Sequence, residues 1–204
     1  MSVQNSGLYG IWPRTTSESQ RDLVTRIRNA RSRINFFGLT RNFYARDEIL
    51  PVFEEKGRTI PVNFYVMDPN CASRKDRYRL EPPEAAMEDP RRYTREVLRP
   101  LFDAAKRVSL DCNPNAGLKI WTYNFQCSFG VEEVDDAYRV MLYGHGKRGT
   151  ESPILGFGEG SEFAAFFAGQ VRWLERLAAE NPEPWQSKGL AVRPLIEDTL
   201  LQNQ

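Results

Sequence analysis

Blocks of apolar and polar residues alternate along the first third of the chain, and their spacing predicts alternating helices and strands. Apolar residues at helical spacing follow hydroxyl residues suited to capping a helix, whereas short apolar and aromatic runs are typical of buried strands. The expected elements are a helix over residues 17–30, a strand over 34–40, a helix over 47–56 and a strand over 60–67. This order predicts parallel strands joined by crossover connections.

The remainder of the chain adds two helices and four strands to the prediction. These are a helix over residues 90–108, strands over 118–124, 127–134, 138–144 and 154–157, and a long amphipathic helix over 163–178. Pro100 lies inside the first of these helices, so a kink or a break is expected there. The last helix carries Phe166 and Leu174 on the face predicted to cover the sheet. The central strands are expected to bury Phe36, Val62, Ile120 and Val140.

These elements predict the α/β class, with a mixed, mostly parallel sheet flanked by helices. A chain of 204 residues with 41% hydrophobic residues is long enough to bury one core. We expect a single domain over residues 1–182 and a C-terminal tail over residues 183–204. The apolar residues of that tail are expected to dock on the body of the domain or on a second copy of the chain.

The charge balance and the rare residues exclude several functions. With 28 Lys and Arg against 27 Asp and Glu, the net charge of +1 argues against binding to duplex DNA. A single histidine excludes multi-histidine zinc sites, and three widely spaced cysteines indicate neither a disulfide framework nor a metal site. No signal peptide or membrane span is recognisable. We therefore expect a cytoplasmic protein that needs no cofactor and no membrane.

Polar residues follow several predicted strands, where ligands bind in parallel α/β sheets. The predicted ligand site consists of Thr40, Arg41, Asp68, Asn70, Tyr123 and Asp135. Arg41 would hold a carboxylate or phosphate and Asp135 would accept a hydrogen bond, so the predicted partner is a small anionic ligand. Two structural interpretations remain: Asp135 is a turn residue that caps its own backbone, or Arg41 and Asp135 only pair with each other.

Other residues with chemical potential also have a structural interpretation. The basic cluster Arg74, Lys75, Arg77 and Arg79 is interpreted as a solvated face, with contact to a phosphate or carboxylate as the alternative. Trp121 and Tyr123 are expected to pack rather than to stack on bases. Cys127 is expected to be a buried small residue rather than a nucleophile, since no cation or histidine lies near it in the sequence.

The order of the elements, with an acidic pair in a late hairpin, resembles one repeat of the phospholipase D superfamily. Catalytic members of that family carry His-x-Lys on a strand and an aspartate five positions after the lysine. The matching stretch here has Ser128, Gly130 and Asp135. The resemblance therefore implies a degenerate, non-catalytic repeat, like the domains at the C-terminus of some helix-turn-helix regulators.

A literal His-x-Lys occurs later, as His145 and Lys147, within a glycine-rich basic segment that is typical of an exposed loop. We expect a non-catalytic ligand-binding or interaction module. The alternative is a phosphodiesterase, nuclease or other small-molecule enzyme that uses His145 and Lys147 across a homodimer.

Overall fold

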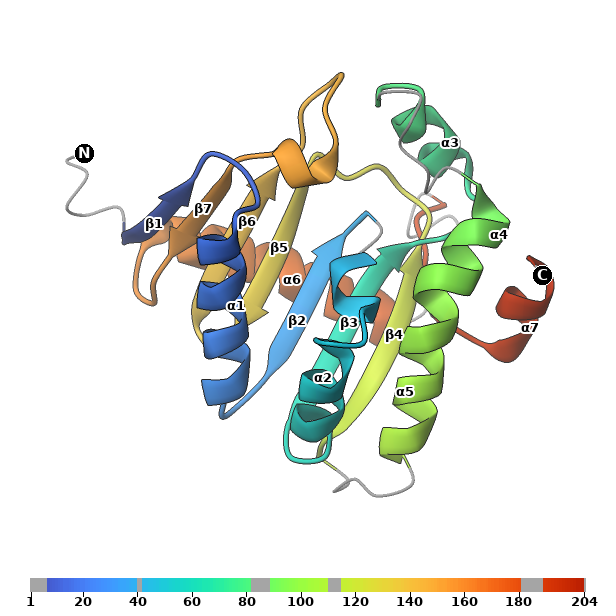
Figure 1. Cartoon of the computed structure of the whole chain (residues 1–204), viewed down its shortest axis with the longest axis horizontal. Coiled ribbons are helices and arrows are strands. Elements are labelled where there is room, and N and C mark those ends of the chain that lie inside the picture. The colour runs from blue at the N-terminus through green and yellow to red at the C-terminus, as the bar shows by residue number, and fades with distance from the viewer. Residues whose placement is uncertain (1–6, 40–41, 82–88, 110–114, 181–188, 204) are drawn as a thin grey trace.

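The computed structural model describes residues 7–39, 42–81, 89–109, 115–180 and 189–203. In this part of the chain, eight strands form one open sheet in the order β1-β7-β6-β5-β2-β3-β4-β8 (Figure 1). The strands are β1 (Leu8–Trp12), β2 (Ile34–Gly38), β3 (Pro61–Met67), β4 (Gly117–Tyr123), β5 (Phe129–Val134), β6 (Ala137–Leu142), β7 (Ile154–Phe157) and β8 (Val192–Pro194). The predicted α/β class and the mixed sheet flanked by helices are confirmed.

The sheet is less parallel than the sequence analysis predicted. Among the described strands, only the β2–β3 and β3–β4 pairings are parallel, and the other five are antiparallel. Helical crossovers connect β2, β3 and β4, whereas β5 and β6 are joined by a two-residue turn, which permits only antiparallel pairing. As β5 also runs antiparallel to β2, its last residue lies beside the first residue of β2.

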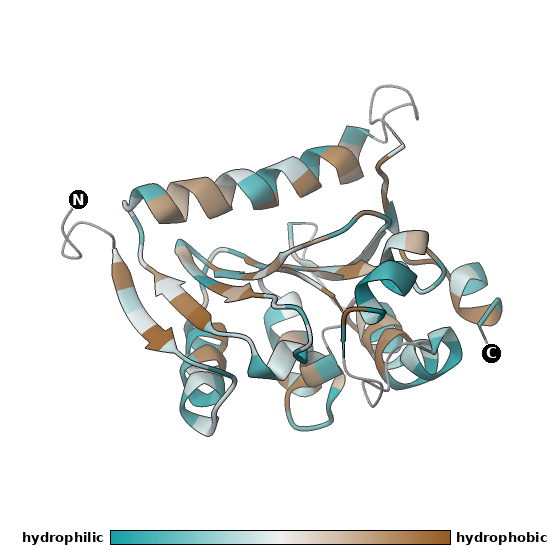
Figure 2. Cartoon of the chain, turned by 90° about the horizontal axis from the view of Figure 1, so that it is seen from above, coloured by the Kyte–Doolittle hydropathy of each residue, from teal (hydrophilic) through white to brown (hydrophobic). Residues whose placement is uncertain are grey.

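Helices cover both faces of the sheet. Figure 2 shows one long helix on one side and the other helices on the opposite side. The long helix is α6 (Glu162–Glu180), and the opposite layer contains α1 (Ser17–Asn29), α2 (Leu50–Gly57) and α5 (Arg99–Ser109). The four residues predicted for the core of the sheet are all buried: Phe36, Val62, Ile120 and Val140.

The helix predicted over residues 90–108 is interrupted, as the position of Pro100 suggested. It consists of α4 (Pro90–Tyr93), a π-helical turn η3 (Thr94–Leu98) and α5. Pro100 has no N–H group to donate to the preceding turn, and a wider π turn is one way in which a helix accommodates such a loss.

The orientation of α6 differs in part from the prediction. Leu174 is buried against the sheet, but Phe166 is 57% exposed and its neighbour Phe167 is buried instead. Phe167 packs against Phe129 and Phe157 of the sheet. The core-facing residues of α6 are Ala164, Phe167, Ala168, Val171, Leu174 and Leu177, and Phe166 lies outside this stripe.

Several elements have no counterpart in the predicted set. The edge strand β1, the helix α3 (Ala72–Tyr78) and the 3-10 turns η2 (Asn42–Ala45) and η4 (Gly149–Glu151) are among them. In the predicted tail, β8 pairs with β4 and α7 (Glu197–Leu201) buries Leu200 in the main core. The described part of the tail therefore docks on the body of the domain.

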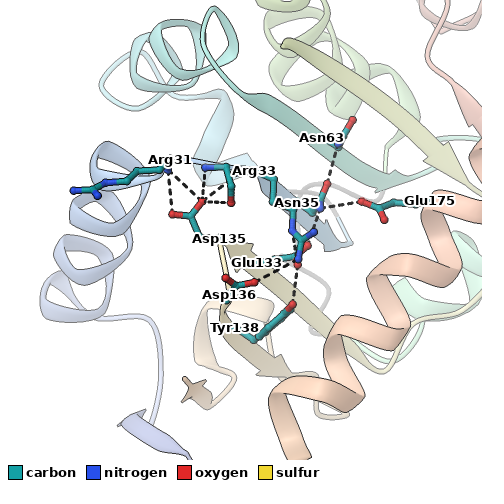
Figure 3. A network of polar contacts seen from close by, with 10 residues as sticks. Arg31, Arg33, Asn35, Asn63, Glu133, Asp135, Asp136, Tyr138 and Glu175 are labelled. Atoms are coloured by element: carbon teal, nitrogen blue, oxygen red, sulfur yellow. Dashed lines mark hydrogen bonds and ion pairs between the residues drawn. The ribbon is translucent and has the colours of Figure 1, made fainter. Parts of the chain in front are cut away.

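Asp135 closes the β5–β6 turn and ties it to the connection between α1 and β2 (Figure 3). Its carboxylate accepts hydrogen bonds from the backbone N–H groups of Arg31, Ser32 and Arg33 at 3.0, 2.8 and 3.2 Å. Its φ of 53° lies in the left-handed region, which aspartate tolerates better than most residues. Although burial opposes the shift, these hydrogen bonds and that of the Ser32 hydroxyl lower the pKa of Asp135.

A second polar network joins β2, β5 and α6. The side-chain amide of Asn35 donates to Glu133 at 2.7 Å and to Glu175 at 3.1 Å (Figure 3). Glu133 also accepts from Arg33 and from the Tyr138 hydroxyl. Burial, and then the charge of Glu133, raise the pKa of Glu175. The contact between α6 and the sheet thus includes a carboxylate whose charged form is disfavoured.

We predict that Asp135→Ala lowers the free energy of unfolding at neutral pH by about 2 to 3 kcal/mol, since it removes backbone hydrogen bonds and leaves alanine at a positive φ. Asp136→Ala is the control because the Asp136 side chain is 59% exposed, and it should cost less than about 0.5 kcal/mol. Urea unfolding measures both. The part of this cost that depends on the ionised carboxylate should disappear as the pH falls below about 4 and through the lowered pKa of Asp135, whereas the cost of alanine at a positive φ should remain. Equal effects of the two variants at neutral pH would contradict this role.

We predict that Glu175→Gln raises the thermal midpoint at neutral pH. A raised pKa in the folded state means that the charged carboxylate destabilises folding above that pKa. Glutamine keeps an acceptor for Asn35 without the charge. The gain should shrink as the pH falls and vanish below about 4, where Glu175 is protonated in both states. Glu180→Gln, at an exposed position of α6, is the control; a destabilised Glu175→Gln protein at neutral pH would contradict the prediction.

Candidate functional site

A cavity of about 390 Å³ lies next to the carboxyl end of β2, where Leu39 lines it, and residues of α1 line it as well. Residues of α1, η2, β5, β6 and η4 contribute to its wall, together with the ends of several connections. The lining includes Leu39, Tyr44, Arg46, Glu81, Arg92, Glu132, Arg139 and Arg148. Segments far apart in the sequence therefore meet at one place in the fold.

A cross-strand pair of opposite charge forms part of the cavity wall. Glu132 of β5 lies directly opposite Arg139 of β6, and their side chains are almost fully buried. The Tyr44 hydroxyl donates a hydrogen bond to Glu132. Asp22 of α1 approaches the Arg139 guanidinium at 3.8 Å from the other side. Burial of these charges is tolerable because each lies next to an opposite charge.

Two carboxylates hold the Arg139 guanidinium in place at ion-pair distances, without a hydrogen bond to either. Its Nε atom is 3.5 Å from Glu132 and its Nη1 atom is 3.8 Å from Asp22, and neither nitrogen has a hydrogen-bond partner among the described residues. The guanidinium also lies 5.0 Å from the centre of the Trp12 ring. Buried N–H donors without acceptors are rare because each costs free energy. Both nitrogens are enclosed by protein and face these carboxylates at ion-pair distances, so the two contacts fix the guanidinium in the cavity wall.

The remaining charged residues of the lining are mainly basic. Arg46, Arg92 and Arg148 accompany Arg139, against Glu81 and Glu132. Glu81 forms an ion pair with Arg77 at 3.1 Å, and burial raises the pKa of Glu81. Burial also raises the pKa of Tyr78, another lining residue, to about 12, so its hydroxyl stays protonated at neutral pH. The lining as a whole carries an excess of positive charge.

Three of the predicted ligand-site residues lie at the expected edge of the sheet but outside the cavity lining. Asp68 accepts a hydrogen bond from the backbone N–H of Asn70 at 2.7 Å, which makes a local turn after β3. Tyr123 is 1% exposed and donates to the backbone carbonyl of Gly38, so it is a core residue. Thr40 and Arg41 lie outside the described residues.

Asp135 lies at the opposite edge of the sheet, so the predicted convergence of all six residues is wrong. The prediction treated every strand end as a carboxyl edge, but β5 runs antiparallel to β2 and ends beside the first residue of β2. Asp135 is a turn residue, but its carboxylate caps the backbone N–H groups of Arg31, Ser32 and Arg33 rather than its own backbone, which the structural interpretation had expected.

His145 and Lys147 are exposed in the connection after β6 and do not line the cavity. Lys147 is 4.0 Å from Glu151, a contact typical of a solvated turn. Arg148, which follows them, does line the cavity.

The basic cluster after β3 is solvated only in part: Lys75 and Arg79 are exposed as expected, whereas Arg74 and Arg77 are buried. Arg74 is 1% exposed, and its guanidinium lies 3.8 Å from the centre of the Tyr93 ring and 4.9 Å from that of Tyr78. Arg77 is buried as well and donates to the backbone carbonyl of Gly144. The aromatic rings provide cation–π contacts for the buried guanidinium of Arg74, which charge counting along the sequence does not reveal.

The sequence analysis overlooked Glu132 and Arg139, although the chain contains a signal for them. A two-residue turn at Asp135 and Asp136 places Val134 opposite Ala137, and therefore Glu132 opposite Arg139. A charged residue in an otherwise apolar strand, with an opposite charge across the hairpin, is unusual in a buried sheet. The pairing across the turn is readable from the sequence, whereas the cavity beside it depends on η2 and η4.

Two features of the described residues bear on the type of site. No group of three or more His, Cys, Asp or Glu side chains in these residues is arranged to hold a metal ion. Among the same residues, no helix has the length and apolarity required to span a membrane.

The comparisons with known proteins found little. No family model and no curated protein matches the chain. Among solved structures, the chain is similar to TrmBL2, an archaeal chromatin protein reported to show a novel mode of DNA binding, with 11% sequence identity and a TM-score of 0.43. The match covers 80% of this chain and 51% of TrmBL2, so the chain spans about half the length of that protein. A similarity at this level carries no information about the ligand or partner of this chain.

Proposed function

We propose that this chain is a non-catalytic module that binds a small ligand with an anionic group in the cavity beside Arg139. The buried Arg139 guanidinium is the observation that carries the proposal. It lines the cavity, it is 3% exposed, and its Nε and Nη1 atoms face Glu132 and Asp22 at 3.5 and 3.8 Å. A guanidinium that two carboxylates already hold in one orientation loses little side-chain freedom when a ligand with an anionic group binds beside it.

The charge of the lining supports an anionic ligand. Four arginines and two glutamates line the cavity, and both glutamates are near arginines. The N-terminal turns of α1 also contribute Ser19 and Gln20 to the wall, and the positive end of a helix dipole favours negative charge. Arginine is well suited to carboxylate and phosphate groups because its planar fork donates two parallel hydrogen bonds.

The resemblance to phospholipase D-like repeats without the catalytic motif supports a binding role rather than catalysis. The positions that match the family histidine and lysine are Ser128 and Gly130, and neither side chain can form a phosphohistidine or neutralise a phosphate. The exposed His145 and Lys147 contribute nothing to the cavity wall.

A ligand panel tests the binding proposal. We expect some small phosphates or carboxylates to raise the thermal midpoint while their neutral analogues do so less, since a ligand at 100 times its Kd adds about 2.7 kcal/mol of stability. Arg139→Lys keeps the buried charge but loses the fork, and should weaken the best ligand about tenfold or more in calorimetric titration. The control is Arg176→Ala, at an exposed position of α6 on the opposite face. A panel without a single binder would refute the proposed function.

We also predict that the purified protein does not turn over bis(4-nitrophenyl) phosphate. The absence of both the nucleophile and its cationic partner removes several orders of magnitude of rate. Steady turnover that is abolished by His145→Ala, with Arg176→Ala as the control, would instead establish the enzyme that uses His145 and Lys147.

A further inference from the structure

The connection between β6 and β7 forms one side of the cavity wall and projects beyond the end of the sheet (Figure 1). Its base is fixed to the sheet, since the N–H groups of Leu142 and Tyr143 donate to backbone carbonyls at 3.1 and 3.0 Å. We call residues 144–151, beyond this base, the strap. Three residues of the strap line the cavity: Arg148, Gly149 and Thr150.

Hydrogen bonds attach the strap to α3 and to the residues that follow this helix. The N–H group of Gly146 donates to the carbonyl of Leu80 at 2.6 Å. The Arg77 guanidinium donates to the carbonyl of Gly144 at 3.2 Å. Because α3 contributes Tyr78 to the cavity wall, these bonds close the wall between α3 and the strap.

A further hydrogen bond attaches the strap to the connection between β1 and α1. The N–H group of Thr15 donates to the carbonyl of Thr150 at 3.0 Å, and both residues line the cavity. The strap therefore reaches from one part of the cavity wall to another, and its position determines how far the cavity is open.

The composition of the strap makes these attachments weak. Residues 144–151 read GHGKRGTE, without an aliphatic residue and without Phe, Tyr or Trp. Moving the strap therefore exposes little apolar surface, and the hydrogen bonds that it loses can be replaced by bonds to water at a small net cost. Segments of this kind open locally at a free energy far below that of global unfolding.

Gly144 is suited to be the hinge of the strap. It directly follows the fixed base, and its φ lies outside the left-handed region. A Cβ placed on Gly144 would meet no atom of the described residues within 4 Å, apart from its chain neighbours. The observed position of the strap therefore does not require glycine there, whereas Gly146, with a φ of 65°, does favour it. The backbone freedom of Gly144 is available for a second position of the strap.

We propose that the strap opens about Gly144 to let a ligand enter the cavity and closes again over it. This inference rests on the proposed function and adds the route by which the ligand enters and leaves. Opening breaks the hydrogen bonds of the Gly146 and Thr15 N–H groups in one event. Arg148 moves with the strap, so an anionic group inside the cavity favours the closed position.

Hydrogen exchange of backbone amides in the ligand-free protein, followed by NMR, tests the opening. The Gly146 and Thr15 amides should have protection factors within about threefold of each other, because one opening exposes both. The Leu142 amide at the base of the strap should exchange at least about tenfold more slowly. Protection factors of Gly146 and Thr15 that differ by about tenfold or more, or that equal that of Leu142, would contradict the proposal.

Gly144→Ala tests the hinge. It should keep the closed strap and reduce the open population about two- to fivefold, since alanine has less backbone freedom than glycine. The Gly146 and Thr15 amides should then exchange more slowly by that factor. The matched control is Gly169→Ala, at a position of α6 where a Cβ also meets no atom within 4 Å, and it should leave both amides unchanged. Equal slowing in the two variants would show that global unfolding, and not the strap, exposes these amides.

Thiol labelling of an Ile154→Cys protein measures access to the cavity, because Ile154 lines it and is 2% exposed. Alkylation of this thiol by iodoacetamide, followed by mass spectrometry, should slow about two- to fivefold when Gly144→Ala is added and should not change when Gly169→Ala is added. Circular dichroism verifies that each variant is folded. Equal labelling rates in all three proteins would refute the strap as the entrance and leave the proposed function standing. A ligand panel without a binder would refute the proposed function, while exchange and labelling, which use no ligand, would still decide whether the strap opens.

Discussion

Two consecutive glutamates of β5, Glu132 and Glu133, are buried on opposite faces of the sheet, at 5% and 2% exposure. A buried carboxylate without a partner costs several kcal/mol, so each face must supply a cation and hydrogen-bond donors. Arg139 lies beside Glu132 and Arg33 beside Glu133. Each glutamate also accepts from a tyrosine hydroxyl, from Tyr44 and Tyr138 respectively. The hairpin between β5 and β6 is therefore fixed from both sides.

The two faces differ in how completely their donors are used. On the α6 face, both Glu133 oxygens accept hydrogen bonds, and Arg33 has a second carboxylate nearby in Asp136. On the α1 face, Arg139 has two nitrogens without a hydrogen-bond partner among the described residues, and a cavity adjoins it. The first arrangement satisfies the polar groups that folding buries. The second keeps a buried ion pair in the wall of a cavity, where a ligand can approach the charged residues.

Local patterns in the sequence account for most of the elements but not for how distant ones meet. The apolar runs that contain Phe36 and Val62 predict the parallel β2–β3 pair, and the position of Pro100 predicts the break before α5. Neither strand alone indicates that β5 runs antiparallel to β2. This pairing places Asp135 at the edge of the sheet opposite to the predicted one. The burial of Arg74 likewise depends on Tyr93, which lies on a separate helix. The residues that the sequence analysis misplaced are therefore those whose positions depend on packing between distant segments.

The side-chain N–H resonance of Arg139 tests the central claim most directly, because the claim is that a ligand binds beside this guanidinium in the cavity. In protein labelled with ¹⁵N-arginine, the Arg139 Nε–H signal is assigned by its loss in Arg139→Lys. A ligand found by titration should shift this signal while the Arg176 signal stays in place, as Arg176 lies on the opposite face. A bound ligand that leaves the Arg139 signal unchanged would contradict the account.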